Sequence, residues 1–401
     1  METHASGTRD AAAAETRRRP ALPERPLLTT PRRLLPHEFL AAERERLARQ
    51  PRLGLAGMLL VLPVAVGLAF AIGGPEQSLL ILGPLSTFAL PAIAMIAFWW
   101  NDWPGSSLRA PLAGLLDTLL VVVGAVVLTM LGQLVVGRVD LRGIFDATAG
   151  AGHPTTFPAT LPLAGATFVA MLQLTLVSEG WPLRHFSRLP AGVAALAVAW
   201  AIALAGYLLL IDSHPPVGQG LHDRTGPVPG AAFGAWLVSV GVWQVCFFVA
   251  LRGWPFADIG RRWLRLTAGN VAVLGDGWLT YLALRHLSSW QTATISAVGG
   301  SVIAAALLVG MLFEGWPASR LPPVRGRLLT LASIAVVSGV LYLLLAAYAD
   351  SVNWTKAKAE EWVSYVGLNA IGAGVILHVA VGRRWPFSQE AKAAPREALD
   401  R

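Results

Sequence analysis

The chain has 401 residues, of which 54% are hydrophobic and 14% are charged, and its mean hydropathy is +0.55. One soluble core of this length could not hide so much apolar surface, so the composition excludes an ordinary soluble protein and indicates residence in lipid. The net charge of +8 does not indicate nucleic-acid binding, because the basic residues lie in short segments between apolar runs.

The N-terminal segment, residues 1–52, differs from the rest of the chain. It carries 11 arginines and 7 acidic residues but no apolar run of spanning length. This composition predicts a disordered basic arm, and the alternating charges of residues 37–49 predict a short surface helix at its end. Because the first apolar run begins only at Leu53, we expect no cleaved signal peptide, and the first span would act as the anchor.

Ten apolar runs follow within residues 53–386, and a disordered tail is expected at 387–401. Each run has roughly 18 to 25 residues, the length that crosses the hydrocarbon layer of a bilayer. The predicted fold is therefore an all-α integral membrane protein with about ten transmembrane helices. They are expected near 53–73, 78–100, 112–136, 161–178, 191–211, 230–251, 266–286, 290–313, 328–349 and 362–381.

Every second run ends in the dipeptide Trp-Pro, at Trp103, Trp181, Trp254, Trp316 and Trp385. The intervals of 78, 73, 62 and 69 residues indicate an internal repeat of five helical hairpins. Indole rings settle at the headgroup boundary and proline ends a helix, so these tryptophans are expected to be interface anchors. Because all copies share one orientation, we expect parallel repeats that form a ring or an arc around the membrane normal.

The distribution of basic residues predicts the orientation. The five segments that carry Trp-Pro contain 15 lysines and arginines, whereas the five loops on the opposite side contain 6. By the positive-inside rule the Trp-Pro side and both termini are cytoplasmic, which predicts a multi-pass protein of the inner or plasma membrane. The use of 29 arginines against 3 lysines suits a bacterial source with GC-rich DNA.

A polar or charged residue stands two positions before each tryptophan of the five dipeptides. From the second copy onward the signs alternate, which predicts ion pairs between neighbouring hairpins. Each pair would contribute only about 0 to 1 kcal/mol but would disfavour wrong neighbours. The expected pairs are Glu179 with Arg252, Arg252 with Glu314, and Glu314 with Arg383.

Polar groups inside the apolar runs are the best guide to function, because an ionisable residue in hydrocarbon is costly and faces protein or water. Asp276, near the middle of its run, is the first candidate for ligand binding, and Asp117 is the second. Asn270, Gln244 and His378 complete the candidate set. The alternative for the two amides is hydrogen bonding between helices, and for the histidine a structural role.

Neither a metal site nor a cofactor is predicted. The single cysteine, Cys246, permits neither an intrachain disulfide nor a cysteine cluster, and we interpret His153, His214 and His222 as ordinary loop histidines. The chain lacks a P-loop, a GxSxG elbow, an HExxH helix and an aspartate-rich magnesium motif, so no catalytic residue is assigned.

Three functions stay open at this level. The leading one is a permease or transporter-like protein for a cation, a proton or a polar small molecule, with Asp276, Asn270 and Asp117 at the substrate. The alternatives are a non-catalytic scaffold or subunit of a membrane complex, and an intramembrane enzyme acting on a lipid-like substrate. The sequence does not favour an enzyme. The expected partners are the lipid bilayer, a small-molecule or ion substrate and other membrane proteins, and not nucleic acid.

Overall fold

A computed structural model describes residues 44–387 with the exception of 109, 149–152, 154–155 and 213–225. Most of the basic arm expected at 1–52, nearly all of the expected tail at 387–401, and His214 and His222 lie outside the described residues.

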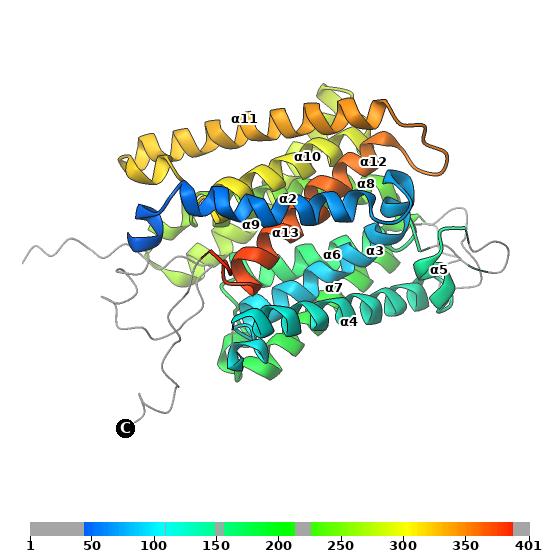
Figure 1. The fold of residues 1–401 in the computed structure, drawn as a ribbon, viewed down its shortest axis with the longest axis horizontal. Helices are drawn as coiled ribbons and strands as arrows, with labels where there is room; N and C mark the ends of the chain where they lie inside the picture. Colours follow the sequence, from blue (N-terminus) through cyan, green and yellow to red (C-terminus); the bar gives the residue numbers. More distant parts are fainter. Residues whose placement is uncertain (1–43, 109, 149–152, 154–155, 213–225, 388–401) are drawn as a thin grey trace, which may run out of the picture.

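Helices make up almost all of the regular structure in the described part of the chain (Figure 1). The only strands there are two short ones that pair in parallel, β1 (Ile211–Asp212) and β2 (Val228–Pro229). The helices are α2 (Arg52–Phe70), α3 (Pro75–Ala94), α4 (Ala110–Val136), α5 (Leu141–Phe145), α6 (Leu161–Leu172), α7 (Arg188–Leu210), α8 (Gly230–Val245), α9 (Arg262–Leu282), α10 (Thr292–Leu307), α11 (Pro323–Asp350), α12 (Ala359–Tyr365) and α13 (Gly372–Ile376).

Eight helical segments of the described chain are long and apolar enough to cross a membrane. This agrees with the predicted class, an all-α protein of the membrane, because ordinary soluble domains do not carry so many such helices. Two of the ten expected spans are not among the eight. The run at 161–178 forms a shorter apolar helix, Leu161–Val177, and the run at 266–286 forms most of α9, which carries several charged residues.

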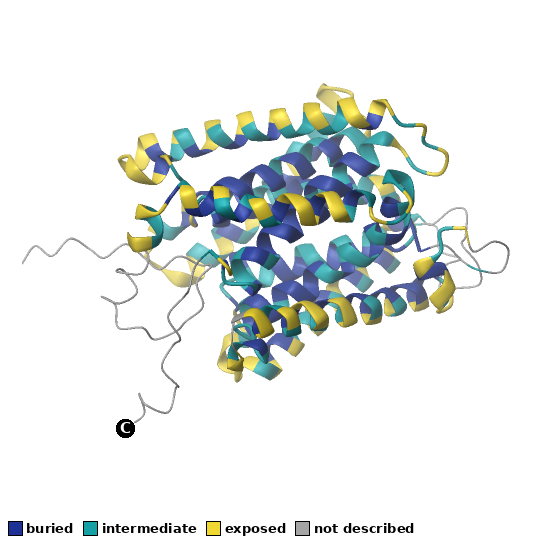
Figure 2. Ribbon diagram, in the orientation of Figure 1, coloured by how far each residue is buried: buried dark blue, intermediate teal, exposed yellow. Residues whose placement is uncertain are grey.

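Five helical segments form an inner ring. α3 packs on α6, α6 on α8, α8 on α10 and α10 on α12, while α12 and the turn after it return to α3. These helices are more buried than the outer ones: 72% of the apolar span in α10 is buried, against 17% in α11. Figure 2 shows the same contrast, with exposed residues along the outer face of α11 and buried residues on α10 behind it.

Five outer helices cover this ring. α4, α7, α9 and α11 each pack along the inner helix that precedes them in the chain. We expected each outer helix to pair with the inner helix that follows it. The extensive packing instead runs across the Trp-Pro junction, because the short connection there holds the two helices antiparallel.

The outer helix beside the last inner segment comes from the other end of the sequence. α2 packs on the π-helical turn Val366–Ile371 and on α13. At the start of α2 the Arg49 Nη2 donates a hydrogen bond of 2.7 Å to the carbonyl of Phe387, and Gln50 Nε2 donates to the carbonyl of Leu312. The first membrane helix therefore occupies the place that a helix following the fifth Trp-Pro dipeptide would take.

The same local structure recurs at all five Trp-Pro junctions. Each inner segment ends in a five-residue π-helical turn, at Met95–Trp99, Gln173–Val177, Cys246–Ala250, Leu308–Leu312 and Leu377–Val381. In every copy the N–H three residues before the tryptophan donates to the carbonyl eight residues before it, and the tryptophan N–H donates to the carbonyl three residues before it. The Trp-Pro peptide bond is cis in all five.

The residue two positions before each tryptophan has a left-handed backbone, with φ between 49° and 56°. A left-handed residue is a common way to end a helix, because it turns the chain and lets its N–H groups reach the last carbonyls. The sequence drew attention to these positions through their charge. Their shared structural feature is the backbone conformation that ends the helix.

Candidate functional site

Asp117 is the most enclosed ionisable side chain of the described spans. It lies on α4, about 10 Å along the axis from the start of the helix, and its exposed fraction is 0%. Its Oδ1 accepts a hydrogen bond of 3.0 Å from the backbone N–H of Gly105. Its Oδ2 is buried and has no hydrogen-bond partner among the described residues.

The turn that follows Trp103 closes directly over this carboxyl. The turn is a short 3-10 helix, Gly105–Ser107. A Cβ atom placed on Gly105 would lie 2.2 Å from Asp117 Oδ2 and 2.5 Å from its Cγ. Only glycine fits at this contact, so the turn after the first Trp-Pro dipeptide packs directly against the Asp117 carboxyl and helps to bury it.

The fifth junction borders the same region. The turn Leu377–Val381 packs on α4 and on the turn Met95–Trp99. Arg383, which follows it, forms an ion pair with Asp102 at 2.9 Å. The carboxyl of Asp117 therefore lies where the first and fifth junctions meet.

Asp276 occupies a different environment. It lies on the outer helix α9 and is half-buried, and its neighbour Trp278 is 49% exposed. Gly277, the residue directly after Asp276, packs against Val240 of α8. Within the described chain no hydrogen bond or ion pair joins Asp276 to another residue, including Asp117 and His286. The residue that we ranked first from the sequence is thus less buried than Asp117, although both lie on outer helices.

Gln173 connects two of the predicted ligand-binding residues, Gln244 and Asn270, through hydrogen bonds. Gln244 Nε2 donates to Gln173 Oε1 at 2.7 Å, and Gln173 Nε2 donates to Asn270 Oδ1 at 2.9 Å. Asn270 in turn exchanges hydrogen bonds of 3.3 Å with Ser178. We call Gln244, Gln173, Asn270 and Ser178 the amide chain. It connects α8, the end of α6, and α9.

His378 lies in the last π-helical turn and is 8% exposed. Its Nε2 has no hydrogen-bond partner within the described residues, and a Cβ on Gly57 of α2 would lie 2.9 Å from it. Its ring centre is 6.1 Å from that of Phe387. α2 therefore covers the side chain of His378 and leaves little of it exposed.

The ion pairs found at the junctions are not those expected from the alternating signs. Glu179 pairs with Arg265 at 2.8 Å and with Arg262, Glu314 pairs with Arg384 at 2.8 Å and with Arg46, and Arg383 pairs with Asp102. Arg252 does reach the fourth junction, but its Nη2 donates to the backbone carbonyl of Glu314. Consecutive left-handed residues turn the chain here, so Arg384, one residue further on, is the one that points inward.

The five junction tryptophans occupy two kinds of environment. Trp181 and Trp385 are exposed, at 53% and 45%. Trp103, Trp254 and Trp316 are half-buried, and the guanidinium carbon of Arg327 lies 4.6 Å from the ring centre of Trp254. The rings of Trp103, Trp254 and Trp316 therefore also pack against protein.

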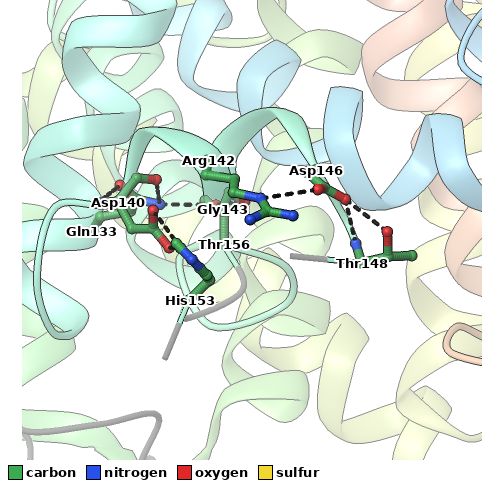
Figure 3. Close-up of polar contacts among 8 residues, drawn as sticks. All are labelled: Gln133, Asp140, Arg142, Gly143, Asp146, Thr148, His153 and Thr156. Carbon is green, nitrogen blue, oxygen red and sulfur yellow. Dashed lines mark hydrogen bonds and ion pairs between the residues drawn. The ribbon is translucent and has the colours of Figure 1, made fainter. Parts of the chain in front are cut away.

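A polar cluster orders part of the loop between α4 and α6, at the opposite end of the molecule (Figure 3). Gln133 donates to the carbonyl of Asp140 and to Thr156, and His153 Nδ1 lies 3.0 Å from Asp140 Oδ2. Burial raises the pKa of Asp140, but hydrogen bonds from His153 and from the backbone of Gly143 outweigh it, so the pKa lies below its usual value. No group of three or more potential metal ligands occurs in the described residues.

Sequence reasoning did not assign roles to Gly105, Asp102 and Arg384. A glycine directly after Trp-Pro occurs only in the first copy, and this difference is a sequence signal that could have pointed to the contact between Gly105 and Asp117. Comparison of the chain with protein-family models, with curated proteins and with solved structures finds no match.

Proposed function

We propose that the chain is a proton-linked membrane transporter in which Asp117 takes up and releases the proton. One observation carries the proposal: a carboxyl group inside a membrane-spanning helix is completely buried, with one hydrogen bond to Oδ1 and none to Oδ2. An ionisable residue is retained at such a costly place mainly where it serves a pathway for ions or protons.

A proton suits this buried carboxyl better than a larger cation does. A buried carboxylate with a single hydrogen bond is costly unless it binds a proton or pairs with a cation. Metal cations need several oxygen ligands, whereas Oδ2 lies in close contact with the backbone of Gly105. Only a proton needs no additional space there.

The proposed topology follows the sequence expectation. The chain would cross the plasma membrane as five parallel helical units, with the Trp-Pro end and both termini in the cytoplasm. The recurring junction structure and the excess of basic residues at that end support this arrangement. Asp117 would then lie near the cytoplasmic end of its span.

A flux measurement tests the proposal. The purified chain is reconstituted in liposomes that contain a pH-sensitive dye, with the membrane potential clamped, and a panel of uncharged and cationic polar solutes is added outside. We expect at least one solute to accelerate proton entry through the wild type, and Asp117→Asn to abolish this acceleration. The matched control Asp276→Asn should retain it, because Asp276 is only half-buried, whereas Asp117 is completely buried. The proposal would be contradicted if no solute accelerated proton entry, or if Asp117→Asn left the accelerated rate unchanged.

A non-catalytic scaffold is the second candidate, and the amide chain favours it. Each amide of this chain bonds to a different helix, which is the arrangement of polar residues that hold helices together. A scaffold predicts no solute-dependent proton flux. It also predicts that Gln173→Leu lowers stability without a change in any transport property.

A further inference from the structure

A groove lies between the inner helix α10 and the outer helix α11, which run side by side (Figure 1). Its volume is about 430 Å³, and it is open along one side. Six of its lining residues recur on α11 at the spacing of a single helix face. They are Leu331, Ile334, Ala335, Ser338, Gly339 and Tyr342.

The groove is hollow because α11 has small side chains in the middle of this face. No neighbouring atom lies within 4 Å of a Cβ placed on Gly339. The hydroxyl of Ser338 donates to the carbonyl of Ala335 in its own helix, so it does not make the wall polar. Ala335 and Gly339 are exposed, so the groove opens at the surface of a membrane-spanning segment, where hydrocarbon is the surrounding medium.

The dimensions of the groove fit one hydrocarbon chain. From Leu331 to Tyr342 it extends about 16 Å along α11, roughly half of the 30 Å hydrocarbon layer. A volume of 430 Å³ over this length corresponds to a cross-section of about 26 Å². A helix with its side chains is about 10–12 Å wide and needs at least roughly 80 Å². An acyl chain can therefore enter the groove, but a helix of another membrane protein cannot.

The groove occupies the half of the span that lies away from the Trp-Pro junctions. On the α10 side it is lined by Trp290, which precedes the helix, and by Val302, near the middle of the span Thr292–Leu312. Trp290 and Tyr342 thus lie toward its outer end. Aromatic side chains with a polar tip are typical of the headgroup boundary.

A basic residue lies at this end of the groove. Arg285 Nη1 donates a hydrogen bond of 3.0 Å to the carbonyl of Trp290. Arg285 is half-buried and forms no ion pair within the described chain, and its guanidinium has further N–H donors that suit a phosphate. The sequence from Gly277 to Phe313 contains no acidic residue, so the cation of a zwitterionic headgroup has no partner in this stretch.

We propose that the groove binds one acyl chain of an anionic phospholipid, whose phosphate accepts hydrogen bonds from Arg285. The lipid would belong to the leaflet at the end opposite the Trp-Pro junctions. Lipid binding at this site does not depend on proton transport, and it assigns the groove a ligand class that the proposed function does not include.

Photo-crosslinking of the full chain in lipid nanodiscs tests the site. The nanodiscs consist of phosphatidylcholine with a small proportion of phosphatidylglycerol that carries a diazirine in the middle of one acyl chain. Mass spectrometry of peptides identifies the labelled residues after irradiation. We expect the label to concentrate around Val302 and Gly339, and to be several-fold weaker on α7, whose exposed Val193 and Ile202 are not part of the groove.

Two glycine variants test the groove itself. Gly339→Leu fills it without meeting a neighbouring atom at the Cβ position, so labelling around Val302 should fall to the level found on α7. Gly67→Leu on α2 is the matched control, because Gly67 is also exposed and has no neighbouring atom within 4 Å, and it should label like the wild type. The comparison of the groove with α7 uses the wild type alone, so it still decides if Gly339→Leu does not fold.

The headgroup is tested by changing the lipid and the arginine. Phosphatidylcholine with the same diazirine chain should label the groove about fivefold less than phosphatidylglycerol, the effect expected of one basic residue on an anionic lipid. Arg285→Gln should remove this difference. Arg325→Gln, at the other end of α11, should retain it.

Label spread evenly over the outer helices, or unchanged labelling of the groove in Gly339→Leu, would overturn the acyl-chain site. Crosslinks between two copies of the chain through α11, with an unlabelled groove, would also overturn it and assign the groove to a protein contact. Equal labelling by the two lipids, or a difference that survives in Arg285→Gln, would overturn the assignment of the phosphate to Arg285.

Discussion

The contact between Gly105 and Asp117 allows a direct test of the burial of this carboxyl through Gly105→Ala. The new Cβ would lie 2.2 Å from Oδ2 and 2.6 Å from Oδ1, so the carboxyl must turn away from the Gly105 N–H. Losing a buried hydrogen bond costs about 1–3 kcal/mol, and crowding a close-packed site costs about 1–3 kcal/mol more. We therefore expect the free energy of unfolding to fall by about 2 to 6 kcal/mol.

The assay is equilibrium unfolding in mixed micelles, followed by tryptophan fluorescence. Gly67→Ala in α2 is the control, because no atom outside its own helix lies within 4 Å of its Cβ position, and it should not destabilise. In an Asp117→Ala background the clashing atoms are gone, so Gly105→Ala should cost less than about 1 kcal/mol there. If the two substitutions are additive, the carboxyl does not lie beneath Gly105 and the reasoning fails.

Three further outcomes are expected. Arg384→Met should lower the free energy of unfolding by about 3–5 kcal/mol, because this buried guanidinium pairs with Glu314 and donates to the carbonyls of Leu312 and Met311. The control Arg383→Met should lower it less, because the ion pair of Arg383 is more exposed. Equal losses in the two variants would contradict the inward placement of Arg384. The lowered pKa of Asp140 stabilises the loop around residues 140–146 above the usual pKa of aspartate, and this stabilisation is lost as the pH falls through the lowered value. Hydrogen exchange of that segment against pH should show the loss in the wild type and not in Asp140→Asn. Arg49→Gln should loosen the start of α2 in the same exchange experiment, since it removes the bond to Phe387. Unaltered exchange there would argue against the packing of α2 beside the last inner segment.

The class of fold was accessible from the sequence because the length of an apolar run is a physical requirement of the bilayer. The number of spans was less accessible. α9 begins with two arginines, Arg262 and Arg265, and also contains Asp276, so its hydrophobicity falls below that of the eight clear spans. Length and hydropathy do not distinguish a short or polar helix in a bundle from a membrane span.

The arrangement of the helices was harder to predict. Inner and outer helices have similar apolar compositions, because lipid and a protein core both favour apolar side chains. The sequence therefore could not show that the side chain of Asp117 is completely buried while that of Asp276 is half-buried, although both lie on outer helices. Nor could it show that α2 packs beside the last inner helix, which depends on contacts between residues about 300 positions apart, such as Tyr365 with the carbonyl of Leu68.

The charges before each tryptophan were visible in the sequence, but their partners were not. The ion pairs predicted from the alternating signs at Glu179, Arg252, Glu314 and Arg383 required all four side chains to point the same way. The left-handed turn redirects the chain within two residues, and Arg384 rather than Arg383 reaches Glu314. A backbone conformation of this kind leaves no reliable trace in charge spacing.

The central claim is that Asp117 holds a proton inside the membrane. Infrared spectroscopy of the reconstituted chain at neutral pH tests it most directly, because a protonated carboxyl has a carbonyl band that ionised surface carboxylates do not contribute. We predict such a band in the wild type and in Asp276→Asn, and its disappearance in Asp117→Asn. A spectrum without the band, or a band that survives in Asp117→Asn, would contradict the account.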